Sequence, residues 1–121
     1  MNNVVKWCLL IKDKYIKLIL SGKKIWEVRT QELFKIGESV ALGNTKSKKI
    51  EGYATISEIR KMTVPEMKKH NDKHYANDFI DKRWKDREWL YALVLSDVKP
   101  NPKQEPYPPS HGNSKVRLKE L

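Results

Sequence analysis

The alternation of apolar and polar positions predicts a short strand followed by a helix at the start of the chain. Residues 4–11 are mostly apolar and rich in β-branched side chains, which is typical of a buried strand. From Asp13, which we expect to cap the helix, apolar residues recur at helical spacing until Gly22 ends the pattern. The helix residues expected to face the core are Tyr15, Ile16 and Ile19.

The remaining pattern predicts more strands, with helices between two of them. Strands are expected over residues 25–30, 39–42, 50–59, 89–98 and 115–118. Thr63 and Glu66 have the spacing of a capping box, so we predict a helix from about 64 to 70 and another from 77 to 84. Five prolines between Pro100 and Pro109 predict an extended connection before the last strand. This order favours an α+β fold that is mainly β, a small antiparallel β-barrel with helices covering its openings.

The strand over residues 25–30 carries the most informative polar positions. Period-2 alternation places Trp26 and Val28 on one face and Glu27 and Arg29 on the other. We expect the first face to be core and the second to be polar and accessible. Substitutions at Lys24 and Glu27 should then cost little stability, as surface substitutions usually do.

Composition adds a preference for an anionic partner. The chain of 121 residues suits one domain spanning residues 1–121, and its 25 Lys and Arg against 15 Asp and Glu give a formal net charge of +10. Such an excess points to RNA or a nucleotide, with DNA also possible. A charged surface that only serves solubility is the alternative.

Several classes of site and compartment are disfavoured. Cys8 is the single cysteine and lies in an apolar run, so we expect a buried thiol and a cytoplasmic protein. No apolar run approaches the ~18 residues of a membrane span. His70 and His74 have a spacing suited to a metal on a helix, but no third ligand stands near them, so we expect neither a metal nor another cofactor.

The first thirty residues carry a family resemblance. Leu10-Ile11-Lys12, then Tyr15, then the run from Ile19 to Arg29 with its G-x-K-x-x-E-x-R segment resemble the ASCH domain, a member of the PUA-like superfamily. The resemblance implies a small barrel with a cleft beside the first helix that holds RNA or a modified base. The residues that it places at the ligand are Lys24, Glu27 and Arg29.

Three further residues are candidates for the same basic cleft. Lys12 stands at the start of the first helix and extends the predicted positive surface. His111 lies in a loop just before the last strand, where it either meets the ligand or belongs to a plain turn. Trp26 offers a ring for base stacking, but core packing is the stronger interpretation, because it lies opposite Glu27 on the strand.

An enzyme is the main alternative to a binding module. One bacterial ASCH branch is similar in size and hydrolyses acylated cytidines with a Lys, a Thr and a Glu. Lys24 matches that lysine, whereas Glu27 stands at the threonine position and Asp72 is the nearest carboxylate in the region of the glutamate. Without the hydroxyl we favour binding, and Lys24 with Glu27 would carry any hydrolysis of acylated cytidine or RNA. A protein partner and the oligomeric state are left open.

Overall fold

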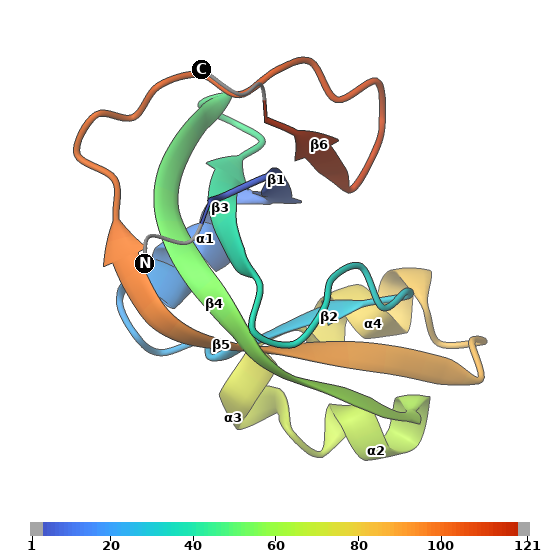
Figure 1. Ribbon diagram of the computed structural model, residues 1–121. Helices are drawn as coiled ribbons and strands as arrows, with labels where there is room; N and C mark the ends of the chain where they lie inside the picture. Colours follow the sequence, from blue (N-terminus) through green and yellow to red (C-terminus); the bar gives the residue numbers. More distant parts are fainter. Residues whose placement is uncertain (1–3, 119–121) are drawn as a thin grey trace.

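The computed structural model describes residues 4–118, which form one six-stranded sheet with short helices (Figure 1). The strands are β1 (Trp7–Ile11), β2 (Trp26–Arg29), β3 (Ser39–Asn44), β4 (Lys49–Thr63), β5 (Trp89–Pro100) and β6 (Lys115–Arg117). The helices are α1 (Asp13–Leu20), α2 (Val64–Lys68), α3 (Asn71–His74) and α4 (Asn77–Arg83). The α+β class is confirmed, and α3 is an element that the sequence did not predict.

The sheet has the strand order β2-β5-β4-β3-β1-β6 and is mixed. All neighbouring pairs are antiparallel except β1 and β3, which run parallel. The expectation of a wholly antiparallel barrel therefore needs correction at this pair. Parallel neighbours require a crossover connection, and α1 with β2, which pairs at the opposite edge of the sheet, supplies it here.

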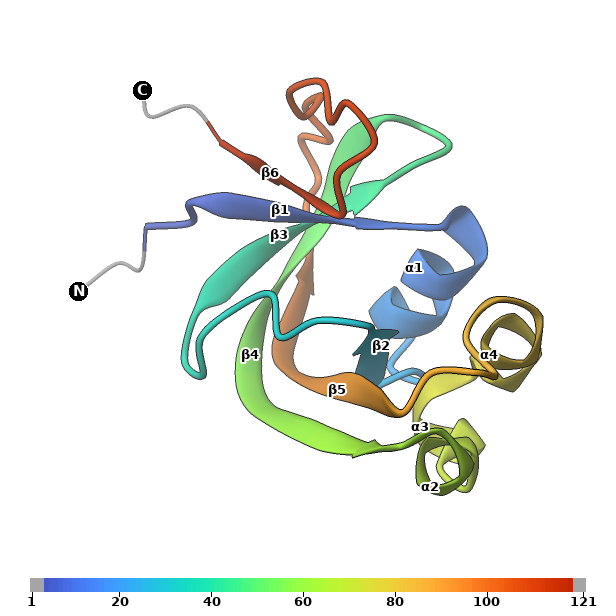
Figure 2. The same ribbon diagram turned by 90° about the vertical axis from the view of Figure 1, so that its right-hand side faces the viewer.

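Strong curvature turns the sheet into a half-barrel, as Figure 2 shows for β4 and β5. The register between these two strands shifts between Tyr53 and Thr55 and again between Ile56 and Glu58. Such bulges bend a strand and increase its twist, which lets one continuous β4 run from Lys49 to Thr63. The main core fills the inside of the curl, where α1 buries Tyr15, Ile16 and Ile19 as predicted.

The helix starts differ in how they are capped. Thr63 accepts a hydrogen bond from the Glu66 backbone N–H at 3.3 Å, so the predicted cap of α2 is confirmed. Asp13 does not cap α1, because Lys12 occupies the N-cap position. The Asp13 carboxylate instead accepts from Asn44 Nδ2 at 2.7 Å and pairs with Lys17 at 3.0 Å. This contact ties the start of α1 to the end of β3.

Gly52 lies where β4 passes α1 and β5 at close range. A Cβ at this position would come within 2.8 Å of Leu20 Cδ2 and within 2.8 Å of the Lys99 backbone oxygen. Backbone cannot swing aside as a side-chain end can, so we expect Gly52→Ala to destabilise the fold by about 1–3 kcal/mol. Urea denaturation would measure the loss of stability. Lys49→Ala, which changes an exposed side chain of the same strand, is the control. Equal stability of the two variants would contradict the predicted clash.

Candidate functional site

A cavity of about 380 Å³ opens where α1, β2, α4 and the loop before β6 meet. Its size lies in the range of small-molecule sites. The lining comprises Leu10, Lys12, Tyr15, Lys24, Glu27, Val28, Arg29, Thr30, Gln31, Leu33, Thr45, Ala76, Phe79, Trp84, Ser110, Gly112, Asn113 and Ser114. Segments from both ends and the middle of the chain therefore build one site. We call it the cleft.

Three charged side chains form a linked group at the wall of the cleft. Lys24 Nζ lies 3.2 Å from Glu27 Oε1, and Arg29 donates to Glu27 Oε2 from Nε at 3.1 Å and from Nη2 at 2.6 Å. Arg29 Nη2 also donates to the Leu10 carbonyl at 2.7 Å, which fixes the guanidinium against β1. Lys24 Nζ in turn donates to the His74 backbone carbonyl and lies 4.9 Å from the Tyr15 ring centroid. The group thus connects β1, α1, β2 and α3.

Burial of this group corrects the expectation of an accessible polar face. Lys24 is 1% exposed and Glu27 is 5% exposed. Burial alone would raise the pKa of Glu27, but the charges and hydrogen bonds of Arg29 and Lys24 outweigh it and hold that pKa below its usual value. Burial lowers the pKa of Lys24, while Glu27 opposes the shift. Mild effects of substitution at these two positions are therefore no longer expected.

Aromatic side chains also line the cleft. Phe79 and Trp84 are half-buried lining residues whose ring centroids lie 4.8 Å apart in an edge-to-face arrangement. The Tyr15 hydroxyl is buried and makes no hydrogen bond to any other described residue. Burial, with the nearby charges of Glu27 and Asp78, raises the pKa of Tyr15, so its hydroxyl stays protonated as a donor at neutral pH.

The other predicted site residues take different places. Lys12 is exposed and lines the cleft, with its Nζ 5.6 Å from the Phe79 ring centroid. His111 is exposed and does not line the cleft, although Ser110 and Gly112 on either side of it do. Trp26 is 3% exposed and lies outside the lining. The burial of Trp26 matches core packing and argues against base stacking by this residue.

The aromatic wall was missed at the level of sequence. The helical spacing of Phe79, Ile80 and Trp84 underlies the helix predicted over residues 77–84, and of these three side chains only Ile80 is fully buried. Helix α4 ends at Arg83, and Trp84 is its C-cap residue with non-helical dihedral angles. The only available signal was an aromatic residue immediately beyond a helix end.

The two histidines considered for a metal have separate structural surroundings. His74 is buried, with Nε2 2.7 Å from the Met67 carbonyl oxygen and Nδ1 accepting from the Ala76 backbone N–H at 2.9 Å. These partners fix the tautomer that carries its proton on Nε2 and occupy both ring nitrogens. The His70 ring lies against Trp26, with centroids 4.9 Å apart. Within residues 4–118 we find no group of three or more His, Cys, Asp or Glu side chains placed to hold a metal ion.

The sequence also predicted a buried thiol at Cys8 and no membrane-spanning segment. Cys8 is fully buried, and burial raises the pKa of its thiol to about 12, so it stays protonated at physiological pH. No helix in the part of the chain described by the structure is long and apolar enough to cross a membrane.

Comparison with known proteins identifies the family. The ASCH domain model matches residues 9–101, and the chain therefore belongs to the ASCH family of PUA-like domains. A serine-to-alanine mutant of ZmASCH from Zymomonas mobilis superimposes with a TM-score of 0.77 at 19% identity, covering 99% of this chain and 92% of that chain. ZmASCH itself gives a TM-score of 0.76 at 20% identity, covering 94% and 87%. No curated protein sequence matches the chain.

Proposed function

We propose that the protein binds a nucleotide or a short segment of RNA in the cleft. The observation that carries this proposal is the meeting of a buried cationic group with an aromatic wall in one cavity. Three cationic side chains and one carboxylate line it, which gives a net charge of +2. An anionic ligand with a flat ring, such as a nucleotide, complements both features.

Arg29 and Lys12 are the groups best placed for phosphate. Arg29 uses Nε and Nη2 for Glu27 and the Leu10 carbonyl, whereas its Nη1 makes no hydrogen bond to another described residue. The guanidinium is thus held in a fixed orientation with one nitrogen left for a ligand, which limits the entropy lost on binding. Lys12, the N-cap residue of α1, adds an exposed positive charge.

The base would lie against the aromatic wall. Stacking on an aromatic ring tolerates any base, so selectivity must come from hydrogen bonds to the base edge or ribose. The Tyr15 hydroxyl is a buried donor in need of a partner, and a ligand oxygen or nitrogen would supply one. The other polar groups in reach of a ligand are Thr30, Gln31, Thr45, Ser110, Asn113 and Ser114.

Binding to nucleoside monophosphates and short RNA and DNA oligonucleotides, measured by isothermal titration calorimetry, tests the proposal. We expect Lys12→Ala to weaken binding by about 1–3 kcal/mol, and Trp84→Leu to cost a similar amount through lost stacking. Lys103→Ala, an exposed lysine outside the lining, is the matched control and should bind like the wild type. Thermal denaturation of each variant separates lost affinity from lost structure.

Two results would contradict this function. Wild-type affinity in both Lys12→Ala and Trp84→Leu would place the ligand outside the cleft. Mass spectrometry can detect turnover of an acylated cytidine or cleavage of RNA. Such activity, if it is lost in Lys24→Met, would favour the hydrolase alternative instead. Stronger binding of DNA than RNA would keep the cleft but change the class of ligand.

A further inference from the structure

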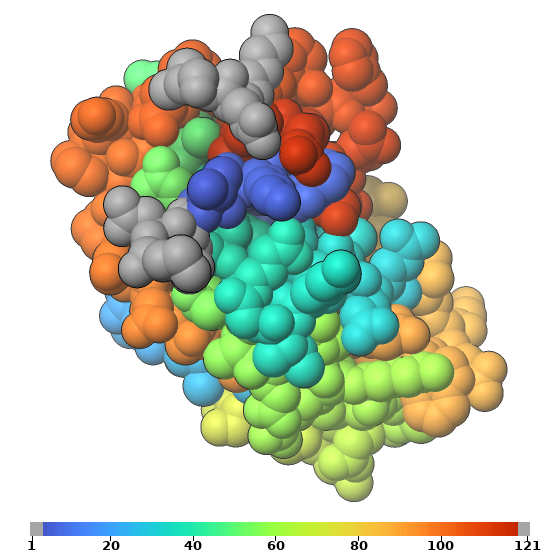
Figure 3. Space-filling model, in the orientation of Figure 1, coloured from blue at the N-terminus to red at the C-terminus, as the bar shows by residue number. Residues whose placement is uncertain are grey.

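A second hollow of about 300 Å³ adjoins the cleft. Its lining is Thr30, Arg87, Glu88, Trp89 and Tyr91, and Thr30 also lines the cleft. In Figure 3 the cyan connection between β2 and β3 lies beside the golden residues at the start of β5. One residue after β2 therefore forms the boundary between the two spaces.

The register of the sheet extends the ligand face of β2 onto β5. Arg29 lies directly opposite Tyr91 in the antiparallel pair, so their side chains share one face. Trp89 precedes Tyr91 by two positions and therefore lies on that same face. Glu27, Arg29, Tyr91 and Trp89 thus follow one another along one side of the sheet, leading out of the cleft.

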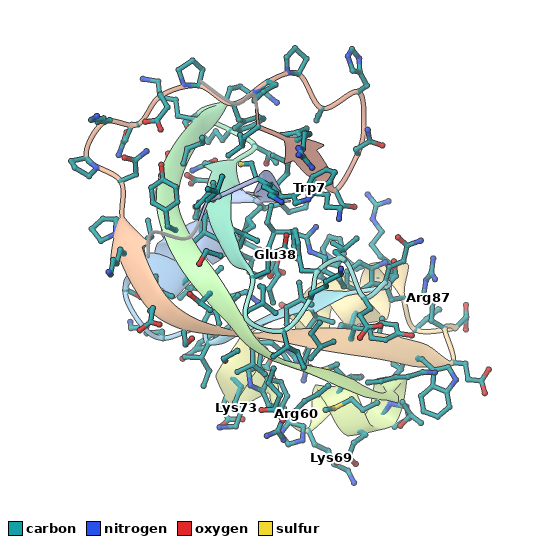
Figure 4. The ribbon with its side chains drawn as sticks, viewed as in Figure 1. Trp7, Glu38, Arg60, Lys69, Lys73 and Arg87 are labelled. Carbon is teal, nitrogen blue, oxygen red and sulfur yellow. The ribbon has the colours of Figure 1, made fainter. Side chains whose placement is uncertain are left out.

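The side chains of this hollow suit a second nucleotide. Trp89 is 40% exposed, with Lys61 Nζ 4.8 Å from its ring centroid, so part of the indole ring is accessible to a stacking base. Arg87 makes no side-chain hydrogen bond or ion pair with other residues in the range 4–118, so its guanidinium is available. Figure 4 shows Arg87 near the start of β5, well apart from Arg60, Lys69 and Lys73.

The charged side chains in and beside the hollow do not repel phosphate. Glu88 offsets Arg87, and the ammonium of Lys61 beside Trp89 restores a net positive charge. A carboxylate is also an acceptor for a ribose hydroxyl or an exocyclic amine. The combination of an exposed ring, an unpaired guanidinium and a flanking lysine is the composition of sites that hold single-stranded nucleic acid.

We infer that the ligand is a single strand of at least two nucleotides, with one in the cleft and the next over Trp89. This inference rests on the proposed function, because it requires a nucleotide in the cleft. The sugar-phosphate backbone that joins the two nucleotides would then pass beside Thr30, which lines both hollows. A single nucleotide would then fill only half of the site, and the second unit would add affinity of its own.

Titration with uridine and adenosine ribonucleotides of one, two and four units tests the inference. We expect affinity to rise about tenfold or more from one unit to two, since stacking of one base contributes about that factor or more. Trp89→Ala should abolish this gain while leaving mononucleotide affinity within about twofold. Arg87→Ala should reduce the gain, and Arg83→Ala, an exposed arginine outside both linings, should not.

The outcomes separate the two proposals. Mononucleotide binding with no gain on lengthening, or a gain that survives in both Trp89→Ala and Arg87→Ala, would overturn the second subsite alone. Absence of binding by every oligonucleotide would overturn the proposed function as well. Because Arg87 is exposed and unpaired among the described residues, its variant keeps the test decisive even if Trp89→Ala fails to fold.

Discussion

Glu27→Gln is expected to lower the free energy of unfolding by about 3–5 kcal/mol at neutral pH. The substitution keeps the shape of the side chain but removes the negative charge that lies between Lys24 and Arg29. The buried ammonium of Lys24 and the partly buried guanidinium of Arg29 would then both lack their counter-charge. Removing one partner of a buried pair is costly because the other charge cannot regain its water. Chemical denaturation at pH 7 measures the effect.

The chain offers a matched control on another strand. Glu58 and Arg60 repeat the Glu-x-Arg spacing of Glu27 and Arg29, with Arg60 Nε 3.0 Å from Glu58 Oε1. Their side chains are 48% and 47% exposed, so Glu58→Gln should cost less than about 1 kcal/mol. Equal losses in the two variants would show that burial of the Glu27 pair contributes nothing.

The pair of Lys24 and Glu27 should also affect how stability depends on pH above neutrality. Burial already lowers the pKa of Lys24 from 10.5, and loss of Glu27, which opposes that shift, would lower it further. A group whose folded-state pKa is depressed in this way costs stability while the unfolded chain holds its proton. Stability of Glu27→Gln should therefore recover partly as the pH rises toward 10.5, and by more than that of Glu58→Gln, in which Glu27 still opposes the shift.

The local order of elements could be predicted because the chain carries strong local signals. The period-2 alternation placed Glu27 and Arg29 on one face, and Gly22 ends α1 with a positive φ of 84°, as a helix-terminating glycine should. Strand β4 was predicted to end at residue 59 but continues to Thr63, because the residues beyond its two register shifts are mostly polar and exposed and show no clear alternation. A shift of register changes which side of the sheet each following residue faces, so periodicity fades while the strand continues.

The site itself could be predicted only in part. The G-x-K-x-x-E-x-R segment led to Lys24, Glu27 and Arg29, and the structure brings all three together. Their burial was not foreseen, because it depends on segments distant in the sequence: Lys24 donates to the His74 carbonyl, 50 residues away, and Arg29 donates to the Leu10 carbonyl of β1. A polar face on a strand predicts water only where nothing distant packs on it. The role of these residues in binding stays a prediction.

His74 is expected to make stability fall as the pH drops from 7 to 5. Burial, which is partly opposed by the hydrogen bond to Met67, lowers the pKa of His74 from 6.5. The folded protein therefore keeps the neutral ring, while the unfolded chain takes up a proton below about pH 6.5. Stability is complete above that pH and decreases below it, by at most about 1.4 kcal/mol per pH unit from this group, until the folded-state pKa is reached.

His74→Gln tests this dependence and links it to the cleft. Glutamine retains a donor for the Met67 carbonyl but has no titrating group, so its stability should vary less between pH 7 and pH 5 in thermal denaturation. The variant should lose about 1–3 kcal/mol at pH 7, because the Ala76 N–H loses its acceptor. His111→Asn, at an exposed position with a φ of 51° that asparagine tolerates, should retain the wild-type slope. Equal slopes in wild type and His74→Gln would contradict the assignment.

Since Lys24 donates to the His74 carbonyl, protonation that loosens α3 should also weaken nucleotide binding in the cleft at acidic pH.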